Sequence, residues 1–166
     1  GSYEIGAGTT PIGLLNKMVR GDETLSTVRL IEGWTFRQFR AELAKADSLR
    51  PTTAALSDEE VMAAVGAPGV AAEGRFHPDT YAYSKGSSDL AVLKRAYHAM
   101  QKRVDAVWQE RAADTPLRSA DDALVLASIV EKETGIASER PMVASAFVNR
   151  LRRPMRLESD PTIIYG

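Results

Sequence analysis

The chain has 166 residues, of which 44% are hydrophobic and 26% are charged, a balance typical of a globular protein with a buried core. Its 21 basic and 22 acidic side chains give a net charge of −1, which does not favour wholesale binding to nucleic acid or to an anionic membrane surface. The absence of cysteine excludes disulfides and thiolate metal sites, and no apolar run approaches the roughly 20 residues of a membrane-spanning helix.

The first part of the chain predicts a small unit of strands and helices. A short strand is expected at Tyr3–Ile5, followed by a helix that Thr10 caps, that Pro11 begins and that ends near Gly21. Alternating apolar and polar residues then predict a half-buried strand at Ser26–Ile31.

A second helix is expected after this strand, because Thr35 and Gln38 form a capping box and Phe39 and Leu43 follow at helical spacing. The segment TVRLIEGWTFRQFRAEL, Thr27 to Leu43, resembles a LysM-type module, in which a strand, a glycine turn and a helix follow one another. The resemblance implies an association with glycan chains that contain N-acetylglucosamine. A generic strand–turn–helix unit would show the same pattern, so both interpretations stay open.

The middle of the chain is rich in alanine, glycine and proline, and residues 50–74 are the most linker-like stretch. Within it, Ser57 and Glu60 form a capping box that predicts a short helix. The next segment, EGRFHPDTYAY from Glu73 to Tyr83, contains a proline that forbids a regular helix. A long amphipathic helix is then expected from Leu90 to about Arg111.

The following helix is expected from about Ala120 to Thr134, stopped by Gly135, and it carries two glutamates near its end. Glu133 continues a stripe of large apolar residues at helical spacing, whereas Glu131 follows smaller and more mixed residues. We therefore predict that Glu133 extends the buried face of this helix and that Glu131 faces outward. The apolar stripe consists of Leu126, Ile129 and Val130.

Glu133 is the candidate general acid. Partial burial and the negative end of the helix dipole would both favour its protonated form, which a proton donor must keep near neutral pH. The alternative is structural: Glu133 would form a buried ion pair with Lys132, Arg140 or another nearby cation.

Other kinds of site find less support in the sequence. The histidines His77 and His98 are far apart and do not form a metal cluster, and no glycine-rich phosphate loop with its lysine is present, so we expect no metal and no cofactor. A basic helix expected from Ser138 to about Arg152 forms a helix–turn–helix with the preceding one, which raises DNA binding as an alternative. Glu139 would lie at the reading end of that helix, where a carboxylate opposes phosphate.

Two blocks of sequence resemble the MltG (YceG-like) endolytic murein transglycosylase family. They are EGRFHPDTYAY and ASIVEKETGIASERPMVASAFVNRLRRPMRLESDPTIIYG, and the resemblance extends from Val28 to Gly166. It implies cleavage of peptidoglycan glycan strands, without water, between N-acetylmuramic acid and N-acetylglucosamine. The family's catalytic glutamate falls in IVEKET, and Glu133 with Thr134 is similar to the Glu-Ser pair of other lytic transglycosylases, which favours Glu133 over Glu131.

In the mechanism that this resemblance implies, Glu133 protonates the glycosidic oxygen and then, as a carboxylate, takes the proton of the muramic C6 hydroxyl. That hydroxyl closes onto C1 and leaves a 1,6-anhydromuramoyl end. A further set of polar and aromatic residues is expected to contact the glycan, each with a structural role as the open alternative. The set is Glu73, Asp79, Tyr81, Arg140, Asn149, Asp160, Thr162 and Tyr165.

The sequence thus predicts an α+β protein with a LysM-like module at residues 3–50 and a mainly helical transglycosylase core at residues 68–166. The resemblance places it at the bacterial inner membrane, with the catalytic part facing the periplasm and with peptidoglycan strands and cell-wall synthesis proteins as partners. The alternative is a non-catalytic peptidoglycan-binding or scaffolding module of the cell-wall synthesis machinery.

Some features depart from the family pattern. His77 stands where we expect an aromatic residue, Gly1 and Ser2 look like a cloning remnant, and the chain stops abruptly at Gly166. Family members continue beyond this point with a region that closes the active site, and they begin with a membrane helix. We therefore expect a soluble fragment, truncated at both ends, that could be inactive by itself while its parent carries the anchor.

Overall fold

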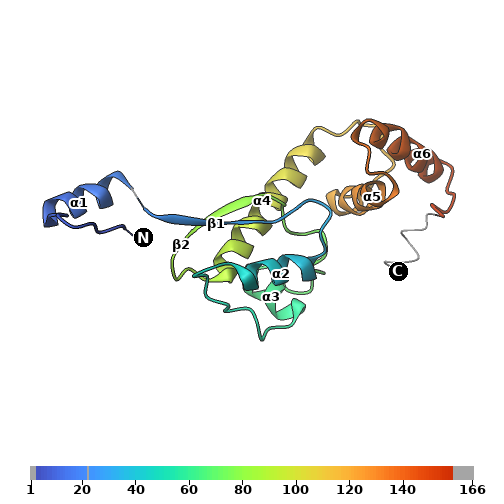
Figure 1. Cartoon of the computed structure of the whole chain (residues 1–166). Coiled ribbons are helices and arrows are strands. Elements are labelled where there is room, and N and C mark those ends of the chain that lie inside the picture. The colour runs from blue at the N-terminus through green and yellow to red at the C-terminus, as the bar shows by residue number, and fades with distance from the viewer. Residues whose placement is uncertain (1–2, 22, 159–166) are drawn as a thin grey trace. The chain divides into compact units, whose positions relative to one another are not determined.

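The structure is a computed structural model and describes residues 3–21 and 23–158. The chain forms two compact units, Gly1–Ala99 and Met100–Gly166. Helices and one two-stranded antiparallel sheet make up the described chain (Figure 1), so the predicted α+β class is confirmed. The LysM-like and transglycosylase modules expected at 3–50 and 68–166 stay predictions.

Most elements lie where the sequence predicts them. Thr35 with Gln38 and Ser57 with Glu60 form the expected capping boxes. In each box the side chain of the first residue accepts a hydrogen bond from the backbone N–H of the second, and the side chain of the second accepts one from the backbone N–H of the first. In chain order the elements are α1 (Pro11–Arg20), β1 (Leu25–Arg29), α2 (Phe36–Lys45), α3 (Asp58–Val65), β2 (Thr80–Ser84), α4 (Asp89–Gln109), α5 (Ala120–Glu133), the short 3-10 helix η1 (Ala137–Glu139) and α6 (Arg140–Arg152).

The sheet of the first unit pairs β1 with β2, a strand that the sequence analysis did not predict. The two strands run antiparallel, with Val28 opposite Tyr81. In β2 the buried Tyr81 and Tyr83 alternate with more exposed residues, but the pattern is only five residues long and follows closely on Pro78. So short an alternation is a weak signal, and only the pairing with β1 defines the strand.

The stretch at residues 50–74 is not a linker, which corrects its interpretation from composition. It contains α3, whose Val61 and Met62 are 0% exposed and lie in the core of the first unit. Small residues are common in linkers, but they also let helices and loops pack closely, so composition alone does not separate the two cases. The other fully buried large side chains of this core are Leu30, Val92 and Leu93.

Asp89, at the start of α4, joins this stretch to the helix. Its side chain is 4% exposed and accepts hydrogen bonds from the hydroxyls of Thr52 and Thr53, each at 2.6 Å, and from both of their N–H groups. Burial acts to raise the pKa of Asp89, but the hydrogen bonds from Thr52 and Thr53 outweigh it, so the pKa lies below its usual value. The carboxylate is thus part of the fold.

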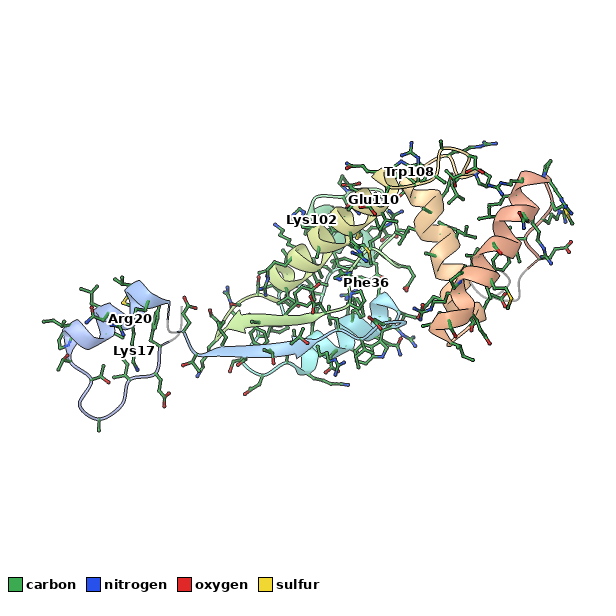
Figure 2. The ribbon with its side chains drawn as sticks, turned by 90° about the horizontal axis from the view of Figure 1, so that it is seen from above. Lys17, Arg20, Phe36, Lys102, Trp108 and Glu110 are labelled. Carbon is green, nitrogen blue, oxygen red and sulfur yellow. The ribbon has the colours of Figure 1, made fainter. Side chains whose placement is uncertain are left out.

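The helix α1 begins at Pro11 with Thr10 as its cap, as predicted, and ends at Gly21, whose φ of 70° suits glycine. None of its residues is buried, and Lys17 and Arg20 project from it (Figure 2). The strand expected at Tyr3–Ile5 does not form, which corrects that prediction. Three residues carry too little alternation to define a strand, and in the part of the chain that the structure describes no other strand pairs with them.

The second unit contains a pair of packed helices, α5 and α6. Ser119 begins α5 with a capping box that includes Asp122. The two helices bury a small apolar cluster, consisting of Leu126, Ile129, Val130 and Phe147. Within residues 3–21 and 23–158, no helix has the length and apolar character needed to cross a membrane.

Candidate active site

The candidate acid, Glu133, is the last residue of α5, and a short turn connects it to α6. The helix ends at Glu133, and Thr134 leaves it with an extended backbone of φ −143° and ψ 130°. Gly135 does not have a positive φ, so it is not the left-handed glycine that the prediction of the helix end assumed. The turn passes through η1 and enters α6 at Arg140.

Glu131 forms an ion pair with the first residue of α6. Its Oε2 lies 3.0 Å from Nη2 of Arg140, and both side chains are partly exposed. The Nε of Arg140 is buried and has no hydrogen-bond partner among residues 3–21 and 23–158. Arg140 is one of the cations named above as a partner for Glu133, and in the structure it forms an ion pair with Glu131.

Thr134 ties the end of α5 to the turn. The residue is 8% exposed, and its hydroxyl donates to Oε2 of Glu139 at 2.8 Å while accepting from the N–H of Ile136 at 3.1 Å. Its own N–H donates to the carbonyl of Val130 at 3.2 Å. Together with the pair between Glu131 and Arg140, these bonds hold the backbone on both sides of Glu133.

The predicted orientations of the two glutamates are wrong. Glu133 is exposed, and Glu131 is the partly buried one. The physical reason lies in the helix end: the buried face runs from Leu126 through Val130 to Thr134, at steps of four residues, and passes Glu133 by. A helical wheel treats positions three and four residues apart alike, and only packing against α6 decides which of them is covered.

The remaining predicted residues of the second unit are only partly described. Asn149 is exposed on α6. Asp160, Thr162 and Tyr165 lie outside the described residues. The guanidinium of Arg150, next to Asn149, donates to the carbonyl of Leu157 and so binds the segment after α6 to that helix.

Three predicted substrate contacts belong to the first unit, and Glu73 has a structural role there. Its Oε2 accepts from the N–H of Phe36 at 3.0 Å, at the start of α2, where helix N–H groups lack partners of their own. In the same segment the ring of Phe76 stacks on that of Phe36, with centroids 4.7 Å apart. The EGRF sequence therefore secures the beginning of α2.

Asp79 and Tyr81 also contribute to the fold. Asp79 is exposed, and its Oδ1 accepts from the N–H of Thr80 at 2.7 Å, which supports the turn role left open above. Tyr81 is only 8% exposed and donates its hydroxyl to the carbonyl of His77 at 2.7 Å. Burial, with a smaller contribution from Asp79, raises the pKa of Tyr81 to about 12 against the opposing effect of Arg95.

The sequence does not predict that the side chains of Thr134 and Glu139 organise the site. They are five positions apart, a spacing for which no helix or turn rule predicts a contact, so their bond depends on the path of the turn. His77 contributes its backbone, since its N–H donates to the carbonyl of Ala96 at 3.0 Å. Among the described residues, no three histidine, aspartate or glutamate side chains gather as a metal site would require.

Comparison with known proteins shows which family and which solved fold this chain is similar to. The sequence model of the YceG-like family matches residues 1–166. A protein of Bacillus subtilis named endolytic murein transglycosylase is 30% identical over 95 residues, which are 57% of this chain and 26% of that protein. The endolytic murein transglycosylase of Streptococcus pneumoniae is 29% identical over 94 residues, which are 57% of this chain and 17% of that protein.

A crystal structure of a YceG-like protein from Listeria monocytogenes has a similar fold. The TM-score is 0.57 at 23% sequence identity, and the match covers 98% of this chain and 59% of that one. At this identity the likeness concerns the fold alone. The aligned residues span about a quarter or less of the length of the two curated relatives.

Proposed function

The chain belongs to the YceG-like family, and on that premise we propose that it acts on peptidoglycan glycan strands as a lytic transglycosylase. Two of its relatives are named endolytic murein transglycosylases. The observation that carries the proposal is the exposed position of Glu133 at the end of α5, next to a turn held on both sides by side-chain bonds.

In the proposed reaction Glu133 is first an acid and then a base. It gives its proton to the oxygen that links N-acetylmuramic acid to N-acetylglucosamine, and the bond between that oxygen and C1 of the muramic residue breaks. The resulting carboxylate takes the proton of the muramic C6 hydroxyl, whose oxygen bonds to C1. The product is a 1,6-anhydromuramoyl end, Glu133 regains its proton, and no water is consumed. One carboxyl group is enough because the nucleophile belongs to the substrate, unlike glycoside hydrolysis with two carboxylates.

Accessibility supports Glu133 over Glu131 in this role. A general acid must come within hydrogen-bond distance of the glycosidic oxygen, and the side chain of Glu133 is open to solvent. Glu131 forms an ion pair with Arg140 at 3.0 Å and is the less exposed of the two glutamates, so a sugar oxygen reaches it less readily. Glu133 is therefore favoured by its exposure, and not by the burial expected from the sequence.

The substrate contacts remain part of the proposal. Arg140 and Asn149 are placed on α6 and are at least partly exposed, so they can offer hydrogen-bond donors to acetamido and hydroxyl groups. Asp160, Thr162 and Tyr165 are retained on the resemblance of the SDPTIIYG segment. Glu73, Asp79 and Tyr81, from the first unit, are weaker candidates, because hydrogen bonds within the fold account for each of them.

The setting of the reaction follows from its substrate. We propose that the protein works outside the cytoplasm, at the inner membrane, where peptidoglycan strands and the proteins that synthesise them are found. The LysM-like reading of the first unit is kept here as a glycan contact, supported by the order of β1, a turn with Gly33 at φ 75°, and α2.

The test is product analysis with matched variants. The protein is incubated with purified glycan strands, and anhydromuramoyl ends are measured by mass spectrometry. We expect Glu133→Gln to lower the yield at least about 100-fold, in line with the loss of a general acid, and Glu131→Gln to lower it less. If Glu131→Gln abolishes the product while Glu133→Gln does not, the assignment of the acid is wrong.

The same experiment separates the non-catalytic alternative. A peptidoglycan-binding or scaffolding module would be pulled down by peptidoglycan and would produce no anhydro ends, with or without either glutamate. Binding without product from the full-length protein would therefore replace the proposed activity by a scaffolding role.

A further inference from the structure

A groove in the first unit runs beside the edge of β2 that does not face β1. In an antiparallel sheet, pairs of residues whose backbone N–H and C=O groups bond to each other alternate with pairs whose groups point outward. The bond from the N–H of Leu30 to the carbonyl of Asp79 shows that these two residues form a pair of the first kind. Two residues further along, the groups of Val28 and Tyr81 also face each other. The N–H and C=O groups of Ala82 and Ser84 must then point away from β1.

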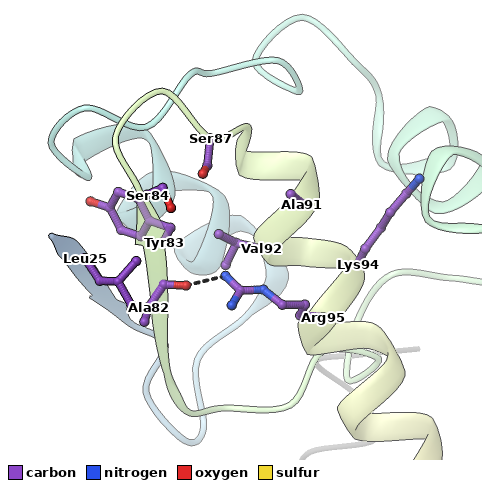
Figure 3. Close-up of a pocket in the computed structure, with 9 residues that line it drawn as sticks. All are labelled: Leu25, Ala82, Tyr83, Ser84, Ser87, Ala91, Val92, Lys94 and Arg95. Atoms are coloured by element: carbon purple, nitrogen blue, oxygen red, sulfur yellow. Dashed lines mark hydrogen bonds between the residues drawn. The ribbon is translucent and has the colours of Figure 1, made fainter. Parts of the chain in front are cut away.

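Two hydrogen bonds agree with this outward direction. The carbonyl of Ala82 accepts from Nη2 of Arg95 on α4 at 2.6 Å, and the carbonyl of Ser84 accepts from the N–H of Ser87 at 3.0 Å. Figure 3 shows the guanidinium of Arg95 reaching from α4 to Ala82. The edge of β2 is therefore a hydrogen-bonding edge, and α4 contacts it through a side chain at this position.

The space between this edge and α4 has the volume of a ligand site. The groove measures about 530 Å³, within the range of sites that hold small molecules or short peptides. Its apolar lining includes Leu25, half-exposed on β1, and the buried Val92 on α4. An edge strand beside a helix is the arrangement in which several domains bind an extended peptide as an additional strand.

The charged residues that line the groove indicate which charge a bound peptide would carry. Lys94 and Arg95, consecutive residues on α4, line it and are both exposed, and among the described residues that line it none is acidic. A carboxylate does come near at one end, where Oε2 of Glu23 accepts from the hydroxyl of Ser84 at 2.8 Å. The cationic side is therefore the one along α4, although the whole chain has a net charge of −1.

We propose that this groove binds an extended, acidic peptide segment of a partner protein, which pairs with the edge of β2 at Ala82 and Ser84. The N–H of the peptide takes over the carbonyl of Ala82, and the guanidinium released by this exchange pairs with a carboxylate of the peptide. Side chains of an extended peptide alternate, so every second residue would face α4, where a carboxylate can meet Arg95. The side chain of Lys94 points away from β2 (Figure 3) and must turn toward the peptide to add its charge. The proposal does not depend on the transglycosylase activity.

The experiment titrates the protein with two short peptides and follows backbone and arginine side-chain N–H signals by NMR. The probes are acetyl-Glu-Val-Glu-Val-Glu-amide and acetyl-Lys-Val-Lys-Val-Lys-amide. We expect the acidic peptide to bind and to shift the signals of Ala82, Ser84 and the Arg95 side chain, with an affinity that falls as salt is raised. An acidic peptide with N-methylated backbone amides should bind at least about tenfold more weakly, because it cannot pair with the edge.

Variants of α4 provide the controls. Lys94→Glu should weaken the acidic peptide about tenfold or more, because it replaces an attraction by a repulsion, and adding Arg95→Glu should weaken it further. Lys102→Glu, an exposed change on the same helix that does not line the groove, should leave the affinity unchanged. Since Arg95 also supports the strand, Lys94→Glu is the decisive variant.

Several results would overturn the proposal. They are a lack of binding, equal binding of the basic peptide, shifts that lie away from the edge of β2, or an affinity that Lys94→Glu does not change. Self-association that Lys94→Glu abolishes would assign the groove to a second copy of this chain and would equally overturn the peptide partner.

Discussion

At the scale of single residues, Glu131 and Glu133 show how two identical side chains acquire different properties. They are two positions apart at the end of α5, yet Glu131 is held by Arg140 and Glu133 is exposed. Neither difference follows from the chemistry of the side chain itself. Glu131 is held because α6 begins with Arg140, and Glu133 is exposed because the chain leaves α5 at Thr134.

Asp89 allows a prediction about pH at the same scale. Its pKa is lowered in the folded protein, so its contribution to stability is complete above the unfolded value of 3.8 and is lost as the pH falls further, through the folded pKa. Asp89→Asn should reduce the free energy of unfolding by about 1–3 kcal/mol at pH 7, because an amide cannot accept all the bonds from Thr52 and Thr53. The difference between wild type and variant should become smaller below pH 4.

Urea unfolding followed by the fluorescence of Trp34, which is packed against the core of the first unit, measures this difference at both pH values. Asp105→Asn, an exposed change later in α4, is the matched control and should have little effect. A penalty for Asp89→Asn that is the same at pH 7 and pH 3 would contradict the role given to its carboxylate.

At the scale of elements, side-chain bonds set where helices begin and how they are connected. The caps Thr35, Ser57 and Ser119 can be read from the sequence, because each acts on residues of its own first turn. The bond from Thr134 to Glu139 differs, since it connects the end of α5 to η1 through the turn. It is the contact by which the backbone after the candidate acid is held.

Thr134→Val should loosen this connection. Valine fills nearly the same space but neither donates to Glu139 nor accepts from the N–H of Ile136, so unfolding of the second unit should be easier by about 1–3 kcal/mol. The amide of Ile136 should exchange with solvent faster, and Thr134→Ser should restore its protection. Ser145→Ala, which removes an exposed hydroxyl on α6, is the control. Unchanged exchange at Ile136 in Thr134→Val would disprove the connection.

At the scale of the whole molecule, charge balance bears on the DNA-binding alternative. A helix–turn–helix of α5 and α6 is present, but Glu139 directly precedes α6, and the chain has a net charge of −1. Phosphate contacts supply most of the affinity for DNA, and a balanced surface offers few of them.

We therefore expect no binding of a labelled DNA duplex at physiological salt, as measured by fluorescence anisotropy. Glu139→Lys, which reverses the charge at the start of α6, tests whether that carboxylate is what prevents binding. Affinity of the unaltered protein that rises steeply as salt is lowered would instead favour the DNA-binding reading over the glycan-directed one.

Local sequence is enough to predict the α+β class, the helix starts at Thr10, Thr35 and Ser57, and the end of α5 with its two glutamates. These features depend on interactions between residues three or four positions apart, which are present in the local sequence itself. Tertiary structure alone decided that residues 50–74 belong to a core, that a second strand pairs with β1, and that Thr134, not Glu133, continues the buried face of α5. Each of these depends on a partner distant in the sequence, and helical or strand periodicity does not specify which partner covers a given face.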